Sequence, residues 1–266
     1  MRTSFPSFLT VIRAVGRVTF SEIVRDKILY NIVLCAFLLF ALSVLGMRLM
    51  FMHQDRLLLD FGLSAVGVSS TAIAIFTGSS LLGREFEKRT IFVALSRPIS
   101  RLSFILGKYL GLVAVLAVNA LLLSAVLLVI LYFATSSTQA LANPALYWAL
   151  GLAFIQSIVL ASVSIFFSTF STTSLSVIMT SGFYLIGNNI SGIRLIAAKE
   201  ESAFYRALLR AVSKVLPNLE HFSLGARVTY GIPIEVSAGV GAICYGLLVS
   251  GFFLLFSGIL IQKRES

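Results

Sequence analysis

Long apolar runs separated by short charged segments dominate the pattern of this sequence. Runs without Lys, Arg, Asp, Glu or His cover residues 28–47, 61–83, 109–193 and 236–262. A helix needs roughly 20 apolar residues to cross the hydrocarbon core of a bilayer, which is about 30 Å thick. Three of the runs therefore predict one membrane span each, and the 85-residue run 109–193 has to be divided.

Two polar breaks divide the long run. The first comprises residues 136–139 and the Asn143-Pro144 pair, and the second is the Ser/Thr-rich stretch 168–174. Clusters of Ser, Thr, Asn and Pro between apolar segments favour loops. The sequence predicts an all-α, polytopic membrane protein, a single transmembrane domain over residues 1–266, with six spans near 28–47, 61–83, 109–134, 145–167, 175–193 and 236–262.

Two amphipathic segments accompany these spans. Residues 8–26 place an apolar stripe opposite three arginines, which predicts an N-terminal helix in the membrane interface. Residues 204–215 repeat this pattern with Arg206, Arg210 and Lys214 on the polar side, and Pro217 closes the segment. We expect an outer amphipathic helix there, between spans five and six.

Composition and charge exclude several classes of protein. Only 12% of the residues are charged, about half the share of an average soluble domain, so a soluble enzyme is excluded. The net charge of +10 arises between apolar runs, where it orients spans and does not indicate a nucleic-acid partner. Lys and Arg number 13 on the side of the N-terminus, the 84–108 loop and the C-terminus, and eight on the other. The positive-inside rule therefore predicts cytoplasmic termini and an outer 194–235 loop.

The 84–108 loop carries the most informative pattern. Charged residues from Arg84 to Arg89 extend the second span, and Pro98 prevents a continuous helix. The apolar stretch 91–95 is stranded between charges on the predicted cytoplasmic side, where it suits docking against a partner. Such a loop can receive force from a cytoplasmic motor.

The chain resembles ABC-2 type transporter permeases over nearly its whole length. The resemblance rests on the basic N-terminal helix, the arginine-rich loop with Thr90, and the motifs SRPISR (96–101) and LGKY (106–109). Three further motifs resemble the branch that contains the maturation permease of the copper enzyme nitrous oxide reductase: FSTFSTTS (167–174), GFYLIGNN (182–189) and LPNLEHF (216–222).

The resemblance implies a homodimer of permeases in a bacterial cytoplasmic membrane, each docked on a separate ATP-binding subunit that holds ATP and Mg. The sequence agrees, because its one Gly-Lys pair, Gly107-Lys108, has Leu102 and Tyr109 where a phosphate-binding loop needs Gly and Ser or Thr. We therefore expect no cofactor and no catalysis in this chain. Family analogy places the ATPase-coupling residues in the loop, at Arg84, Glu85, Glu87, Arg89, Arg97, Pro98 and Arg101.

Other polar and soft side chains are candidate contacts for a substrate. Met47, Met50, Met52 and His53 form a set suited to Cu(I), with boundary packing as the alternative. Asn119, Gln156, Asn188 and Asn189 could line a substrate path or form interhelical hydrogen bonds. Gly107 and Gly111 form a Gly-x-x-x-Gly motif that permits close helix packing, for example at a dimer seam.

Two mechanisms and one competing class follow. The chain either passes a substrate across the membrane or transmits conformational work to an outer partner, such as a periplasmic protein or a lipoprotein. An intramembrane enzyme is disfavoured because both histidines, His53 and His221, fall in predicted outer loops and no hydrolase motif occurs.

Overall fold

The structure is a computed structural model of the whole chain. It describes residues 8–49, 54–87, 100–134, 143–200, 202–223, 225–229 and 235–264. Within these ranges all regular secondary structure is helical, which confirms the predicted all-α class.

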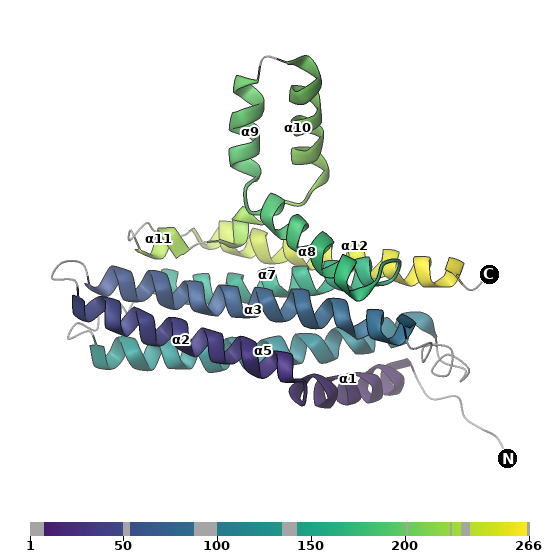
Figure 1. The fold of residues 1–266 in the computed structure, drawn as a ribbon, viewed down its shortest axis with the longest axis horizontal. Coiled ribbons are helices and arrows are strands. Elements are labelled where there is room, and N and C mark those ends of the chain that lie inside the picture. The colour runs from purple at the N-terminus through teal and green to yellow at the C-terminus, as the bar shows by residue number, and fades with distance from the viewer. Residues whose placement is uncertain are drawn as a thin grey trace.

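Five long helices run side by side and form the body of the molecule (Figure 1). Each contains a segment long and apolar enough to cross a membrane. They are α2 (Lys27–Leu49), α3 (Gln54–Glu87), α5 (Arg101–Ala134), α7 (Pro144–Ser168) and α12 (Val236–Arg264). The first four predicted spans and the last are thus present as helices, with ends that differ from the prediction.

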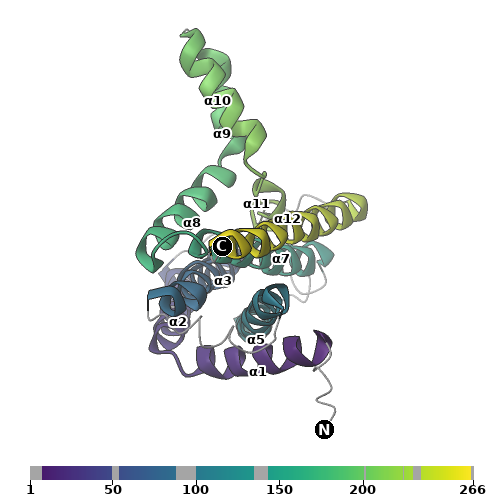
Figure 2. The same cartoon turned by 90° about the vertical axis from the view of Figure 1, so that its right-hand side faces the viewer.

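Helix α1 (Phe8–Val24) packs mainly against α5, at the edge of the bundle (Figure 2). We call this end of the bundle the α1 end, and it also holds the end of α3, the start of α5 and the last turn of α12. Ile12, Thr19 and Ile23 of α1 are buried, whereas Phe8 is exposed. A helix is therefore present at the predicted place, with much of its apolar stripe packed on protein, and its location in the membrane interface stays a prediction.

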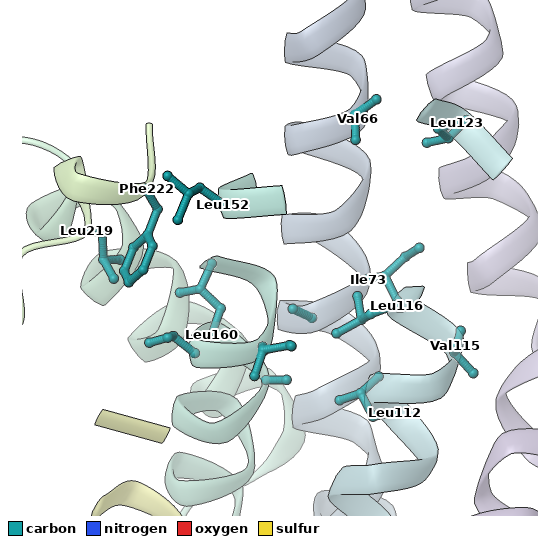
Figure 3. Packing of buried hydrophobic residues seen from close by; sticks show 14 of the residues in the cluster. Val66, Ile73, Leu112, Val115, Leu116, Leu123, Leu152, Leu160, Leu219 and Phe222 are labelled. Carbon is teal, nitrogen blue, oxygen red and sulfur yellow. The ribbon is translucent and has the colours of Figure 1, made fainter. Parts of the chain in front are cut away.

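The core lies between α3, α5 and α7. Ile73 of α3 and Leu116 of α5 are fully buried and face each other in Figure 3. Leu152 of α7 is also buried there, next to Phe222 of the short helix η1 (Glu220–Phe222). The three central helices thus form one framework against which the other segments pack.

Both predicted breaks in the long run are confirmed. Asn143 caps α7: its side-chain Oδ1 accepts a 3.0 Å hydrogen bond from the amide N–H of Ala145. Pro144 occupies the first turn, where its missing N–H costs nothing. At the second break α7 ends at Ser168 and α8 (Thr173–Gly187) begins after a short turn.

The predicted fifth span, 175–193, is wrong as one continuous helix. Helix α8 ends at Gly187, and α9 (Ile190–Lys199) starts after the Asn188-Asn189 pair. With 15 residues α8 is about 22 Å long, shorter than a bilayer core. The asparagines end the helix because their amides compete for backbone hydrogen bonds. The Nδ2 of Asn189, for example, donates to the carbonyl of Leu185 at 2.8 Å.

The predicted outer loop 194–235 is mostly helical. Helices α9 and α10 (Ala203–Val215) form a hairpin that stands steeply away from the bundle, on the side opposite α1 (Figures 1 and 2). The chain then returns to the core, where Leu219 and Phe222 are buried. The short helix α11 (Gly225–Thr229) follows and packs on α3. The sequence therefore predicted α10, but it missed the returning segment.

The 84–108 loop is also shorter than predicted. Helix α3 continues to Glu87, and α5 already begins at Arg101, so both helices extend beyond the predicted span boundaries. Residues 88–99 lie outside the described ranges.

Candidate functional site

A buried lysine joins three helices at the α1 end. Lys108 of α5 is only 4% exposed, and its Nζ lies 2.6 Å from Oε1 of Glu85 on α3. The same Nζ lies 3.7 Å from Oε2 of Glu22 on α1 and 5.7 Å from the ring centroid of Phe104. A buried ammonium needs such partners, because burial without a counter-charge is costly. The charges therefore tie α1, α3 and α5 together.

Close backbone contact reinforces this junction. A Cβ atom built on Gly111 would lie 2.7 Å from the carbonyl oxygen of Gly16, and one on Gly107 would lie 2.6 Å from Cβ of Val15. Both glycines are thus needed for the approach of α1 to α5. The Gly-x-x-x-Gly motif, expected to suit a dimer seam, is used inside the chain.

Of the predicted coupling residues, the structure describes the side chains of Glu85 and Arg101. Glu85 is part of the junction with Lys108, and Arg101 begins α5 with a half-buried side chain. Arg84 and Glu87 belong to α3, although their side chains lie outside what the structure describes. Arg89, Arg97 and Pro98 also lie outside the described residues. Glu85 lies in the last turn of α3 and Lys108 about two turns into α5, so their ion pair joins the two helices that flank residues 88–100.

Sequence reasoning missed Lys108. In the sequence this lysine stands out only as a mismatch to a phosphate-binding loop. A further signal was present, since it lies between the apolar residues Ile105–Leu106 and Tyr109–Leu110, where a cation needs a partner. Glu22 and Glu85, each at a predicted helix end on the same side, were the available carboxylates.

The predicted path residues divide between two places. Asn119 of α5 is buried against α3, where it accepts from Ser69 Oγ at 3.4 Å and donates to Ser70 Oγ at 3.2 Å. Its amide is therefore used to join two helices. Asn189 is exposed and donates to the carbonyl of Leu185 in the last turn of α8, away from the α3–α5 contact.

Gln156 and Asn188 lie together. Gln156 Nε2 donates to Asn188 Oδ1 at 2.9 Å, which joins α7 to the end of α8. Both residues line a cavity of about 180 Å³ between α3, α7 and α8, together with Tyr184, Ser64 and Ser223. This cavity is smaller than typical ligand pockets, which begin near 300 Å³. It can accept a few water molecules, and a larger substrate would require the helices to separate.

We predict that Gln156 and Asn188 stabilise the fold as a unit. Replacing either by Leu leaves the other amide without this partner, and a membrane interhelical hydrogen bond contributes about 0.6–2 kcal/mol. A double-mutant cycle on thermal unfolding of the purified chain should show coupling of about 1 kcal/mol between Gln156→Leu and Asn188→Leu. Asn189→Leu serves as the control and should not couple to Gln156→Leu. Strict additivity of the first pair would contradict the interaction.

The soft cluster proposed for Cu(I) lies almost entirely outside the described residues. Met47 belongs to α2, but its side chain is not described, and Met50, Met52 and His53 fall in the interval between α2 and α3. The copper contact therefore stays a prediction.

Taken together, these features define a class of protein. In its described residues the chain has five helices suited to cross a membrane, a shorter apolar helix and a charged junction between α1, α3 and α5. It is a multi-pass helical membrane protein. Residues 13–210, more than half of the chain, match the family model of the ABC-2 family transporter proteins, so the chain belongs to this family. Members are membrane components of ATP-binding cassette transporters. A search of curated proteins found no significant match.

Proposed function

We propose that this chain is the permease of a transporter in which a separate ATP-binding subunit drives movement of a substrate across the membrane. The observation that carries the proposal is the 2.6 Å ion pair between Glu85, in the last turn of α3, and Lys108, about two turns into α5. It joins the two helices that flank the 88–100 segment. A force applied to that segment reaches α3 and α5 together, and through Glu22 it also reaches α1.

The partner subunit supplies the chemistry in this proposal. It binds ATP and Mg, and it docks at the cytoplasmic side through Arg84, Glu87, Arg89, Arg97, Pro98 and Arg101. Two copies of the permease form a homodimer in a bacterial cytoplasmic membrane, with both termini in the cytoplasm. The family membership and the excess of Lys and Arg on that side support this arrangement.

The route of the substrate is the next part of the proposal. The Gln156–Asn188 cavity lies at the end of α8 and is also lined by Gly225, the first residue of α11. Its opening would connect this region to the interior of the bundle. The three motifs shared with the nitrous oxide reductase maturation branch favour a role in assembling a copper enzyme. Met47, Met50, Met52 and His53 would then contact the metal as cargo.

Transmission of conformational work to an outer partner is the second candidate. Two observations favour it: the Gln156–Asn188 cavity is small, and the two side chains that give it its name are hydrogen-bonded to each other. Both are features of a closed contact between helices and not of an open passage. The outer partner would be a periplasmic protein or a lipoprotein. One experiment distinguishes the two functions. If substrate passes through the cavity, widening it by Gln156→Ala should change which substrates are moved, whereas transmission of conformational work predicts no such change.

Loss of the coupling arginines should release the ATP-binding subunit. We expect Arg97→Ala combined with Arg101→Ala to abolish co-purification of a polypeptide that is labelled by azido-ATP from native membranes. Arginine pairs dock through charge-assisted hydrogen bonds, each contributing about 1.5–3 kcal/mol. Arg210→Ala with Lys214→Ala on α10 removes the same charge elsewhere and should leave the complex intact. Retention of the labelled subunit by the first variant would contradict the docking site.

A further inference from the structure

A second cavity lies between α9, α12 and the returning segment that contains η1. Its volume is about 810 Å³, within the range of ligand pockets and more than four times that of the Gln156–Asn188 cavity. Its polar lining comes from Ser191, Arg194, Asn218, Glu220, His221 and Tyr245. The wall formed by α12 carries small residues, among them Ala238, Gly241 and Ala242.

The polar wall of this cavity is held in place. Both carboxylate oxygens of Glu220 accept hydrogen bonds from Ser191, one from its amide N–H at 2.7 Å and one from its hydroxyl. The hydroxyl of Tyr245 accepts from the amide N–H of Asn218 at 3.0 Å, which attaches the returning segment to α12. His221 contacts the edge of the Tyr245 ring, with centroids 6.2 Å apart. The site is therefore formed before any ligand arrives.

The charged side chain of this cavity that is available to a ligand is the positively charged Arg194. The Glu220 carboxylate is already engaged by Ser191 at the start of α9, where the helix dipole also favours a negative charge. Arg194 follows three residues later and is exposed, and its guanidinium makes no hydrogen bond or ion pair with any other described residue. Arginine binds phosphate oxygens through paired N–H donors. His221, a second exposed donor on the same cavity, complements it.

Apolar surface adjoins these polar groups. Leu195, next to Arg194, is 66% exposed, and Val240, within the candidate span of α12, is 49% exposed. Gly241 has no other atom within 4 Å of where its Cβ would be, so the α12 wall leaves open space. A ligand with a phosphate at one end and hydrocarbon at the other fits this combination.

We propose that the cavity binds the headgroup of a membrane phospholipid, with its phosphate at Arg194 and His221. The glycerol and first acyl carbons lie along Ala238, Gly241 and Ala242. The site belongs to this chain alone and does not depend on the ATP-binding subunit. Bound lipid would also fasten the base of the α9–α10 hairpin to α12.

Lipid retention tests the proposal. The full chain, purified in mild detergent and re-supplied with phosphatidylglycerol or phosphatidylethanolamine, is examined by native mass spectrometry. We expect one tightly held phospholipid per chain. Arg194→Gln should lower its affinity at least about tenfold, the effect of losing a charged hydrogen bond. Arg210→Gln on α10 removes a charge outside the cavity and should have no effect.

A second variant keeps the arginine and fills the space instead. Gly241→Leu should displace the lipid, whereas Gly251→Leu, at another open glycine of α12, should not. Equal retention by Gly241→Leu and Gly251→Leu would overturn the proposal even if Arg194→Gln failed to fold. Displacement of the lipid by millimolar glycerol phosphate would also overturn it, since a soluble phosphate ester would then be the ligand.

Discussion

Lys108→Met should destabilise the chain and weaken the connection of α5 to α1 and α3. Methionine preserves the length and packing of the side chain, so the change removes the charge alone. Removal of one partner from a buried ion pair costs roughly 3–5 kcal/mol. Here the side chains of Glu85 and Glu22 are 24% and 60% exposed, so water screens part of the loss. We therefore expect a loss of about 2–3 kcal/mol, measured by thermal unfolding of the purified chain.

The double variant Lys108→Met with Glu85→Gln separates charge from coupling. Without the carboxylate at position 85, the main electrostatic cost disappears, and most of the stability should return. The ion pair between α3 and α5 is still absent. The transmission of motion from the ATP-binding subunit to the spans should therefore not return. Lys214→Met on the exposed face of α10 is the matched control and should leave stability unchanged. A double variant as unstable as Lys108→Met would show that the ion pair is not the cause.

Gly111→Ala should detach α1 from α5. The added Cβ would lie 2.7 Å from both the Gly16 carbonyl oxygen and Thr19 Cβ, and a backbone atom cannot move aside without moving the helix. Overpacking of this kind costs about 1–3 kcal/mol, and Gly107→Ala adds a second clash with Val15. We expect the pair to lower the unfolding temperature. Arg13 and Arg17 are already exposed, but release of α1 from α5 should let the helix unfold locally, so that trypsin cleaves at these residues.

Glycines in open positions provide the control for this experiment. Gly151 on α7 and Gly182 on α8 have no other atom within 4 Å of the place that an added methyl group would take, so their replacement by Ala should be tolerated. In a membrane helix the same substitution also raises helix propensity. If Gly107→Ala/Gly111→Ala left α1 protected from trypsin but abolished the dimer, the result would contradict this prediction. It would indicate that the Gly-x-x-x-Gly motif lies at a dimer seam.

The apolar pattern was sufficient to predict the parts of the fold that depend on hydrophobic length. The run 28–47 lies within α2, and the Asn143-Pro144 pair starts α7, because Pro is tolerated only in the first turn of a helix. The repeat of Arg206, Arg210 and Lys214 likewise marked α10. These features are local, so a short window of the sequence is enough to predict each of them.

The features that the sequence did not predict depend on contacts between distant segments. The division of the chain by charged residues does not detect the Asn188-Asn189 break, since both residues are uncharged. Its geometry is fixed in part by Leu219, whose amide donates to the Gly187 carbonyl at 2.9 Å. The burial of Phe222 depends likewise on α7 and α12. Of the candidate site, Glu85 was predicted, whereas Lys108 became visible only when α1, α3 and α5 were brought together.

In the proposed function, nucleotide-driven motion enters through the 88–100 segment and reaches the spans by way of the Glu85–Lys108 pair. This route is tested most directly by the distance between spin labels on Val236→Cys in the two copies of a homodimer, with Cys35 and Cys244 replaced by Ala. Val236 is exposed at the start of α12. With the ATP-binding subunit bound, addition of ATP and vanadate should change this distance in the wild-type background and leave it unchanged in Lys108→Met/Glu85→Gln. An equal change in both backgrounds, or no change in either, would contradict the claim.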